Sequence, residues 1–389
     1  MACDEGTRTY RIVILGAGLS GLSLARALAR REVSGPILIV DRKPAMADDR
    51  TWCYWETPGC DFSDLAIMRW DRWNYRDVSG VYEQRSERHR YTCIRGIDFY
   101  RRSLDDIRDA AIDVAFDEHV LNVREEAREC AIVTRKRTLR AERVFDARGI
   151  APGMHDRHAI VQRFAGYRVQ TATPAFDPRS ATLMDVQPDT EDGFHFFYVL
   201  PFGEREALIE NTYFALRPIG AARLRRELDD YARRFERHAP VVAHVETGAI
   251  PMSAGRDLPQ ETRRYTPIGL RGGCARPGSG YTFHRVQEQV ARIAESLARG
   301  ERPVRTFAAK APVCDRIFLD ILRRRPDLAP RIFRRLFAST NGGSLARFMM
   351  DAPSLLDSTL VVGASGAGAL EGALAAPRPE KATPLYANR

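Results

Sequence analysis

The sequence predicts an α/β fold, in which an inserted antiparallel sheet interrupts a domain built on a parallel sheet and a helical region follows. Two observations lead to this prediction. Near the N-terminus, apolar runs alternate with a glycine turn and a helical stretch, which is typical of parallel strands joined by helices. From residue 162 to 252 the apolar residues instead recur at every second position, with one helical stretch among them.

The chain has 389 residues, which is enough for two domains. We expect the first domain to occupy two segments of the chain, with the inserted domain between them. The expected ranges are 10–160 and 263–310 for the first domain, 161–262 for the inserted substrate domain, 311–356 for a basic helical region and 357–389 for a flexible tail.

The N-terminal stretch has the order strand, glycine turn, helix and strand. An apolar run at 12–15 leads into the glycine motif GAGLSG at 16–21, and a second apolar run at 37–40 follows the helical stretch. This is the Rossmann-like arrangement, in which the glycines allow a tight turn, close approach to a pyrophosphate and close packing of the helix. The helix N-terminus faces the phosphates, and an acid after the second strand binds ribose. The expected cofactor contacts are Gly16, Ala17, Gly18, Gly21 and Asp41.

A second glycine-rich segment, residues 266–281, precedes a helical stretch at 282–297. Its glycines place another backbone turn before a helix N-terminus, which suits the flavin end of a dinucleotide. Together with the N-terminal motif, this segment favours FAD over NAD. An apolar strand within 139–148 is expected to rejoin the parallel sheet. The cofactor contacts expected in the second segment are Gly273, Gly278, Gly280 and Tyr281.

The inserted domain contains the residue best suited to acid chemistry. Its expected strands lack helices between most of them, which predicts antiparallel pairing. In the strand 207–215, Glu210 shares one face with apolar residues because side chains alternate. Glu210 is either a solvated edge residue or, beside an apolar cavity, a general acid with a raised pKa. The expected strands are 164–171, 181–186, 194–200, 207–215 and 241–250, with a helix at 221–237.

The composition argues against several classes of function. A net charge of +9 suits nucleic acid or an anionic membrane surface, but no zinc-finger, RNA-binding or helix-turn-helix pattern accompanies it. We therefore expect no nucleic-acid partner. The seven cysteines and eight histidines are dispersed, which predicts no metal site and a reduced cytoplasmic location. No stretch of the sequence is long enough to span a bilayer.

Three other stretches are less regular. Residues 42–89 are expected to be irregular, and the aromatic run around Trp52 and Trp55 forms either a loop docked on the core or a wall beside the cofactor. Residues 311–350 combine arginines with apolar residues at helical spacing. This pattern predicts either packing helices with a solvated face or helices that lie on an anionic membrane. A glycine-rich run at 363–368 is assigned to the tail.

Many ordered motifs resemble the flavin-dependent lycopene cyclases of bacteria, from residue 12 to about residue 356. The resemblance has two departures: a mild one at Arg276-Pro277-Gly278, where relatives usually carry Lys-Pro-Ser, and a more serious one after residue 357, where relatives continue with an apolar helix and this sequence turns rich in glycine and alanine. Besides the N-terminal glycines, the matching motifs are DRTWCYWE (49–56), IRGIDFY (94–100), FDARG (145–149), ATLMD (181–185), FFYVLPF (196–202), ALIENT (207–212), IPM (250–252), PIG (267–269) and GYTF (280–283).

The resemblance implies an isomerase-type lycopene beta-cyclase that closes the ψ end groups of lycopene into β-ionone rings, giving β-carotene through γ-carotene. It implies that Glu210 is the essential acid, that Arg95 contacts the cofactor, and that reduced FAD acts without net redox change. Ring closure passes through a carbocation, which aromatic faces stabilise by about 0.5 to 2 kcal/mol each. The aromatic residues expected in the substrate pocket are Trp52, Trp55, Tyr198 and Tyr213.

The resemblance also implies partners. NAD(P)H is the expected source of electrons, and lycopene or a related linear carotenoid is the expected substrate. Since a carotenoid dissolves in the membrane, we expect peripheral association with the inner face of the cell membrane. The main alternative is an FAD-dependent monooxygenase or reductase acting on a prenyl or aromatic substrate, which would consume NAD(P)H at every turnover. A further alternative is a non-catalytic protein that binds FAD or a carotenoid.

Overall fold

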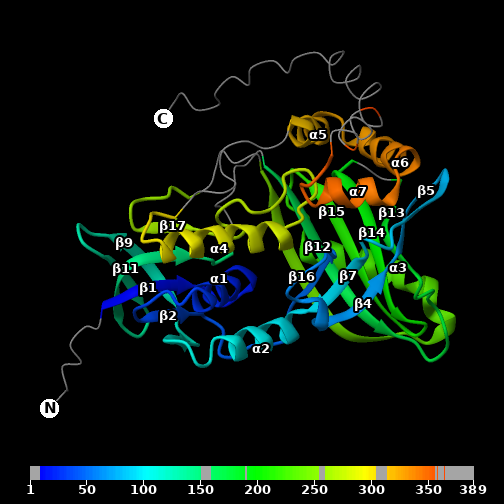
Figure 1. Ribbon diagram of the computed structural model, residues 1–389. Helices are drawn as coiled ribbons and strands as arrows, with labels where there is room; N and C mark the ends of the chain where they lie inside the picture. Colours follow the sequence, from blue (N-terminus) through cyan, green and yellow to red (C-terminus); the bar gives the residue numbers. More distant parts are fainter. Residues whose placement is uncertain are drawn as a thin grey trace, which may run out of the picture.

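The computed structural model describes residues 9–149, 159–188, 191–253, 259–303 and 313–354, together with Asp357 and Gly363. Figure 1 shows two sheet-containing units side by side, one around the N-terminal strands and one formed by long twisted strands. The predicted α/β fold class is therefore confirmed. Most of the expected tail and of the glycine-rich run at 363–368 lies outside the described residues.

The first sheet is built around parallel strands. Its order is β8-β2-β1-β11-β10-β9, and β17 also pairs with β11. The parallel pairing of β17 with β11 confirms that the chain returns to this sheet after the insertion. The bounds are β1 (Thr9–Leu15), β2 (Ile37–Val40), β8 (Ile112–Ala115), β9 (Val120–Glu125), β10 (Cys130–Thr134), β11 (Thr138–Asp146) and β17 (Tyr265–Pro267).

Both faces of the central strand β1 are buried. Ile12 and Ile14 pack with apolar residues of three helices, whereas Val13 and Leu15 belong to a cluster on the opposite face. A strand that is covered on both sides has apolar residues at successive positions. This is why β1 could be predicted from the sequence. The three helices are α1 (Leu19–Arg30), α2 (Gly96–Asp106) and α4 (Phe283–Ala298).

The second sheet has the order β16-β12-β15-β14-β13-β5-β6. The strands expected in the inserted domain are all present, and they pair antiparallel with one another. One pair differs from the expectation, because β5 runs parallel to β13. The bounds are β5 (Arg72–Asp77), β6 (Gly80–Arg85), β12 (Ile160–Gln170), β13 (Ser180–Val186), β14 (Phe194–Gly203), β15 (Glu206–Ala215) and β16 (Val241–Met252).

The expectation that residues 42–89 are irregular is wrong. Two of its strands, β5 and β6, extend the second sheet, and two others form a small sheet with β7. Aromatic, polar and charged residues are mixed along these strands, so the apolar alternation that reveals other strands is missing. We therefore propose that the inserted domain also includes residues 72–85. The small-sheet elements are β3 (Thr51–Trp55), η1 (Ser63–Leu65), β4 (Ala66–Trp70) and β7 (Tyr91–Arg95).

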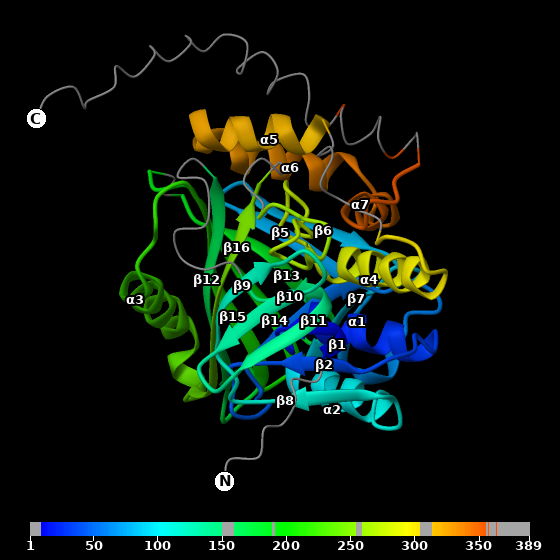
Figure 2. The ribbon, with the colours of Figure 1, turned by 90° about the vertical axis from the view of Figure 1, so that its left-hand side faces the viewer.

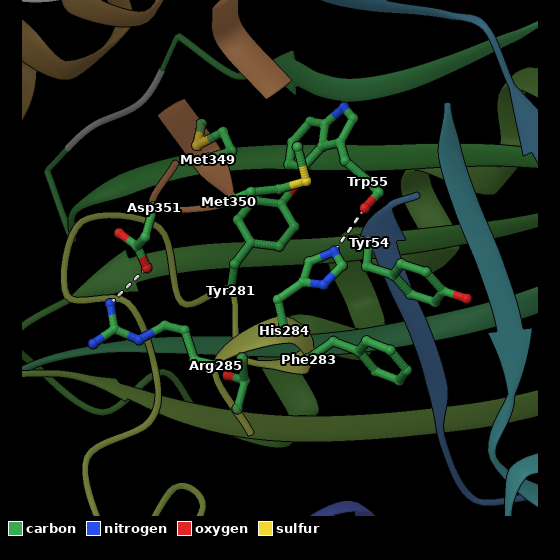
Figure 3. Close-up of a pocket in the computed structure, with 10 residues that line it drawn as sticks. Tyr54, Trp55, Tyr281, Phe283, His284, Arg285, Met349, Met350 and Asp351 are labelled. Atoms are coloured by element: carbon green, nitrogen blue, oxygen red, sulfur yellow. Dashed lines mark hydrogen bonds and ion pairs between the residues drawn. The ribbon is translucent and has the colours of Figure 1, made fainter. Parts of the chain in front are cut away.

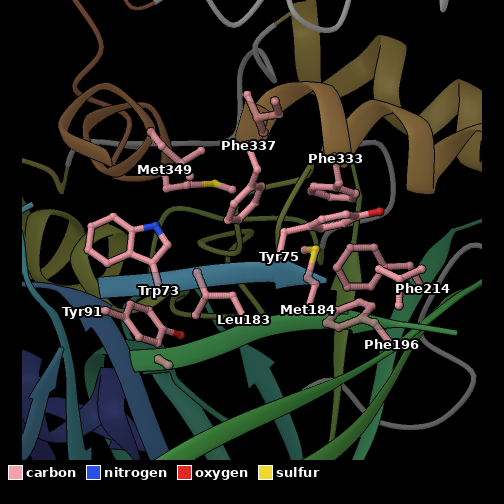
Figure 4. Packing of buried hydrophobic residues seen from close by; sticks show 14 of the residues in the cluster. Trp73, Tyr75, Tyr91, Leu183, Met184, Phe196, Phe214, Phe333, Phe337 and Met349 are labelled. Atoms are coloured by element: carbon pink, nitrogen blue, oxygen red, sulfur yellow. The ribbon is translucent and has the colours of Figure 1, made fainter. Parts of the chain in front are cut away.

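Helices cover the second sheet on both faces, as Figure 2 shows. Ile209 and Tyr213 pack on the face covered by α3, whereas Leu208 and Phe214 belong to the cluster that includes Phe333 of α6. Figure 4 shows this second cluster. Strand alternation therefore gives β15 two different environments. The covering elements are α3 (Ala221–Ala232), η2 (Arg233–His238), α5 (Val313–Arg324), η3 (Pro326–Leu328), α6 (Ala329–Ser339) and α7 (Gly342–Met349).

The helices within the described ranges include none that is long and apolar enough to cross a membrane. Two arginines of the C-terminal helices form ion pairs with other parts of the protein. Arg334 pairs with Asp77 at 3.4 Å, and Arg347 pairs with Asp357 at 2.8 Å. These two arginines therefore contribute to packing, and the exposed basic surface comes from other residues of α5 and α6.

A buried ion pair joins the C-terminal helices to the first domain. Arg276, in the second glycine segment, makes two hydrogen bonds of 3.1 Å to the carboxylate of Asp315 in α5. Both side chains are almost fully buried, and the guanidinium also lies 4.2 Å from the centroid of the Phe348 ring. A Cβ on Gly278 would come within 2.8 Å of Asp315. A glycine at position 278 therefore leaves room for the Asp315 carboxylate that pairs with Arg276.

We expect Asp315→Asn to lower the free energy of unfolding by about 3 to 5 kcal/mol, because it removes the bidentate partner of the buried Arg276 charge and leaves the more distant Asp351, at 3.5 Å, as the remaining counter-charge within the described residues. The matched control is Asp320→Asn in the same helix, which removes an exposed pair with Arg324. The Asp320→Asn substitution should lower the free energy of unfolding by less than about 1 kcal/mol. Urea denaturation of the three proteins measures both values. Equal losses in the two variants would contradict this account.

Candidate active site

The N-terminal glycines have the geometry that a dinucleotide requires. Gly16 has φ of +100°, and a Cβ on Gly21 would lie 1.9 Å from the Gly16 carbonyl oxygen. A Cβ on Gly18, in contrast, would meet no atom within 4 Å. Gly18 also precedes α1 without any side-chain cap. The turn thus requires glycine at position 16, and the close packing of α1 requires glycine at position 21. The open space beside Gly18, at the N-terminus of α1, suits a phosphate.

Asp41 lies where a ribose-binding acid is expected. Its Oδ2 accepts a hydrogen bond of 2.6 Å from the backbone N–H of Ala17, and its Oδ1 accepts one of 2.8 Å from that of Lys43. The buried carboxylate is thereby fixed at the end of β2, beside the glycine turn. This position fits the ribose next to a pyrophosphate on the same turn.

The two glycine segments lie against each other. A Cβ on Gly269 would come within 2.0 Å of the Ser20 hydroxyl of α1, so the second segment contacts the helix that follows the first. Gly273 and Gly280 have positive φ values of 77° and 73°. A Cβ on Gly280 would also meet Gln162 Oε1 at 2.3 Å. The described residues therefore fit a dinucleotide cofactor that spans both segments.

Arg95 has a different environment from the glycines. It precedes α2 and forms a bidentate ion pair with Asp98, with distances of 2.8 and 3.1 Å. Its contact with the cofactor stays a prediction.

Glu210 lies within the second sheet. Strand β15 pairs with β12 on one side and with β14 on the other, so the edge interpretation of Glu210 is wrong. Its direct cross-strand neighbours are Tyr198 and Gly166. The Thr212 hydroxyl donates a hydrogen bond of 3.0 Å to the Glu210 carboxyl. An acid is thus held in the middle of a mostly apolar sheet face.

Burial raises the pKa of Glu210 to about 8, and the negative charge of Glu246 contributes to the increase. The hydrogen bond from Thr212 acts in the opposite direction. Since the ordinary value for glutamic acid is about 4.3, the environment keeps Glu210 protonated near neutral pH. A protonated carboxyl in an apolar setting is what a general acid requires.

A narrow apolar cavity lies between the Glu210 face of the sheet and helices α6 and α7, and its free volume of about 10 Å³ has room for about one water molecule. Three residues predicted from the sequence, Trp55, Tyr198 and Tyr281, line it. The structure therefore brings these three together on the face that carries Glu210. Other lining residues are Leu183, Phe214, Phe333 and Met349.

Neutral phenols gather on this side of the sheet. The Tyr281 hydroxyl donates a hydrogen bond of 3.4 Å to that of Tyr91, and Tyr281 also hydrogen-bonds with Tyr198. Burial raises the pKa of Tyr91 and of Tyr198 well above their usual value. The Trp55 ring lies 4.9 Å from the ring centroids of both Tyr91 and Tyr281. These rings remain uncharged and offer π faces.

A second cavity, with a free volume of about 20 Å³, shares Trp55, Tyr281 and Met349 with the first. Figure 3 shows its lining residues, with His284 beside the Trp55 carbonyl and Arg285 paired with Asp351. The two cavities are therefore separated by a few shared side chains. Together they give the site an elongated, mostly apolar outline.

Two of the predicted pocket residues lie elsewhere. Trp52 packs edge-on against Phe99 and Tyr100 of α2, at centroid distances of 5.1 and 5.6 Å. Tyr213 stacks on His195 at 4.0 Å, on the sheet face covered by α3. In each case the alternation of side chains along a strand turns the residue away from Glu210.

The sequence interpretation missed Glu246. This residue lies on β16, is buried, and interacts electrostatically with Glu210. The sequence feature that could have identified Glu246 is an isolated acid within an expected strand, which is also the feature that identified Glu210 as a candidate. Tyr91 was also missed as a site residue, because only the tertiary structure brings it to Tyr281. Within the described residues, no group of three potential ligands could hold a metal ion.

Comparison with known families identifies the chain. The profile of the lycopene cyclase protein family matches residues 11–366. The chain belongs to the lycopene cyclase protein family. This confirms both the family resemblance and the class of enzyme expected from the sequence motifs.

Relatives of this lycopene cyclase family member are known from several bacteria. The lycopene beta-cyclase of a Paracoccus strain is 26% identical over 337 residues, covering 84% of this chain and 82% of the relative. The lycopene beta-cyclase of Pantoea ananas is 25% identical over 288 residues, covering 70% of this chain and 71% of the relative.

Solved structures similar to this cyclase family member share its fold. A geranylgeranyl bacteriochlorophyll reductase-like protein from Thermoplasma acidophilum has a TM-score of 0.65 at 14% identity, covering 94% of this chain and 99% of that one. The halogenase PltM in complex with phloroglucinol and FAD has a TM-score of 0.55 at 12% identity, covering 94% and 85%. These likenesses support the flavoprotein-like fold expected for the chain.

A pair of glycine variants tests the dinucleotide site. We expect Gly18→Ala to fold with nearly unchanged thermal stability, because its Cβ meets open space and its φ of −89° suits alanine. It should nevertheless weaken FAD binding about tenfold or more, because the methyl group blocks the pyrophosphate. Gly21→Ala should lower the melting temperature even without FAD, since its Cβ would collide with the Gly16 carbonyl.

Flavin fluorescence titration and thermal melting measure the two effects. Unchanged FAD affinity in a folded Gly18→Ala protein would contradict the assignment of the pyrophosphate to this turn.

Proposed function

We propose that the protein is a lycopene beta-cyclase, which converts the ψ end groups of lycopene to β-ionone rings through γ-carotene to β-carotene. The observation that carries the proposal is the position of Glu210, a carboxyl on a mostly apolar sheet face, directly across from Tyr198, which lines the apolar cavity. Burial there raises the pKa of Glu210, which favours the protonated acid. Family membership supports the linear carotenoid as substrate. The fold of the solved neighbours is also compatible with flavin-dependent chemistry.

Glu210 gives its proton to the terminal double bond of the end group. The resulting tertiary carbocation attacks the next double bond, the ring closes, and loss of a ring proton leaves the β-ionone ring. The π faces of Trp55, Tyr198 and Tyr281 stabilise the cation by about 0.5 to 2 kcal/mol each. The close packing around them excludes water, which would otherwise trap the cation as an alcohol. Trp52 and Tyr213, although expected in the pocket, have no part in this proposal.

The proposed cofactor is FAD in its reduced form, with NAD(P)H as the source of electrons. Gly16, Ala17 and Gly18 would hold the pyrophosphate, and Asp41 the ribose. The flavin end would lie along the second segment, near Gly273, Gly278 and Gly280, with Arg95 and Tyr281 as further contacts. When bound, reduced FAD supplies negative charge that stabilises the developing cation, and this explains a redox cofactor in a reaction without net oxidation.

We propose that α5 and α6 rest on an anionic membrane surface at the inner face of the cell membrane, from which the carotenoid enters. Val313 and Ile317 are exposed apolar residues on α5, 62% and 36% accessible. The exposed arginines Arg316, Arg323 and Arg331 lie on the same pair of helices. Exposed apolar side chains among arginines are typical of interfacial helices.

The test of the proposed function is conversion of lycopene by purified protein with reduced FAD, with carotenoids separated by chromatography. We expect wild-type protein to form γ- and β-carotene, and Glu210→Gln to lower turnover at least about 100-fold, because the amide cannot donate an acidic proton. NAD(P)H should not be consumed in proportion to product. Stoichiometric consumption with oxygenated or reduced products would instead identify the monooxygenase or reductase alternative.

The pH dependence gives a second readout of the same variant pair. Because Glu210 must be protonated to act and its pKa is about 8, turnover should fall as pH rises through about 8. An alkaline limb near the ordinary pKa of a carboxylic acid would contradict the assignment of Glu210.

The membrane proposal predicts binding to vesicles that contain anionic lipid and weaker binding to zwitterionic ones. The triple variant Arg316→Glu, Arg323→Glu and Arg331→Glu should reduce co-sedimentation with anionic vesicles at least about tenfold, since each basic residue contributes about 1 kcal/mol. The matched control changes Arg124, Arg128 and Arg135, which are exposed on the β9–β10 edge of the first sheet. Equal losses in both triple variants would contradict binding through α5 and α6.

A further inference from the structure

Resting on the cyclase function proposed above, we propose that Glu246 is the base that removes the ring proton after ring closure. The proposal begins with strand register. Gly166 of β12 pairs with Glu210 of β15 on one side and with Glu246 of β16 on the other. Residues in one row across a sheet point to the same face. The two carboxyl groups therefore share the face of the sheet on which ring closure is proposed.

Gly166 contributes no side chain of its own between the two acids, and the Leu208 side chain lies beside this position, with Cδ1 3.2 Å from where a Cβ on Gly166 would be. A Cβ at this position would lie 3.2 Å from Cγ of Glu246 and 3.6 Å from Cβ of Glu210. Their Cα atoms are two strand spacings apart, about 10 Å. In this proposal one end group lies over Gly166, beside Leu208, and contacts both carboxyl groups, each from its own side.

The surroundings of the two acids differ in charge. Glu246 is hydrogen-bonded by Thr51 and lies near the cationic Arg50, and both favour its ionised form, whereas Asp48 opposes it. Arg50 is itself held in place by a 2.7 Å hydrogen bond to the Thr247 carbonyl. The Oε2 atom of Glu246 is buried and has no hydrogen-bond partner among the described residues. A carboxylate oxygen without a donor remains available to accept a proton from carbon.

Glu210 has no comparable cation. The groups that interact with it are Glu246, the Thr212 hydroxyl, and the neutral phenols of Tyr198 and Tyr281. The negative charge of Glu246 favours the protonated form of Glu210. Two acids whose surroundings separate their protonation in this way are suited to opposite roles in one reaction. Glu210 is the donor and Glu246 the acceptor.

The steps balance without an oxidant or a reductant. The O–H bond of Glu210 breaks as a C–H bond forms at the terminal double bond, which becomes a cation at the substituted carbon. A carbon–carbon bond closes the ring and moves the cation to the adjacent ring carbon. The ring C–H bond then breaks, its electron pair forms the ring double bond, and its proton passes to Glu246. A proton transfer from Glu246 back to Glu210 across Gly166 restores the starting state.

The pH profile distinguishes the two acids. Burial raises the pKa of Glu246 to about 7, with Arg50 and Thr51 opposing the increase, while the pKa of Glu210 is about 8. Since the base must be ionised and the acid protonated, turnover should fall below about pH 7 and above about pH 8. Glu246→Gln should lower turnover at least about 100-fold and remove the acid limb. Glu246→Asp should restore part of the turnover together with that limb.

Solvent deuterium gives a readout that a purely structural role would not change. In Glu246→Gln the protonated end group returns to reactant more often than it completes the reaction. Unconverted lycopene recovered from D₂O should therefore carry deuterium with Glu246→Gln, but not with Glu210→Gln. Glu83→Gln, an exposed acid on β6 of the same sheet, is the matched control and should behave as wild type. FAD content and thermal melting verify that each variant is folded.

The outcomes separate this inference from the proposed function. If wild-type protein cyclises lycopene while folded Glu246→Gln retains its turnover and its acid limb, the assignment of the base is wrong and the cyclase function stands. If Glu246→Gln loses turnover without deuterium in the recovered lycopene, the base role is also wrong. If folded wild-type protein with reduced FAD converts no lycopene, the cyclase function itself fails, and the base role with it.

Discussion

The desolvation of Glu210 is the constraint on which the rest of the site depends. A carboxylic acid stays protonated near neutral pH only where water and cations are kept away. The position of β15 between two other strands removes one route for water, and the cluster beneath α6 and α7 removes another. The sheet and its covering helices therefore serve chemistry as well as stability.

The same packing makes the C-terminal helices part of the candidate active site. Phe333 and Met349 come from α6 and α7, yet they line the cavity beside the Glu210 face. The Arg276–Asp315 ion pair fixes α5 against the second glycine segment of the first domain. One set of contacts thus connects the cofactor segment, the covering helices and the cavity, and a shift in any of them would change the hydration of the acid.

Glu210 and Glu246, for which we propose opposite roles, show how a sheet can give two residues of one type different surroundings. Both are glutamates on the same face, and a single glycine separates them. Both accept a hydrogen bond from a threonine hydroxyl, but only Glu246 also lies near a cation, Arg50, that favours its ionised form. The difference arises because the chain around β3, which lies 195 residues before Glu246, brings Arg50 and Thr51 beside β16.

The sequence by itself determined the local features of this protein. The glycine turn, the apolar parallel strands and the alternation of β15 follow from short-range rules, so Gly16, Gly18, Gly21 and Glu210 could be singled out as candidates from the sequence. The tertiary structure decided which distant residues meet. It brought Tyr91 to Tyr281 and Glu246 to Glu210, turned Trp52 and Tyr213 away, and placed β5 and β6 in the second sheet. Strand pairing joins segments far apart in sequence, and local periodicity carries no information about that choice of partner.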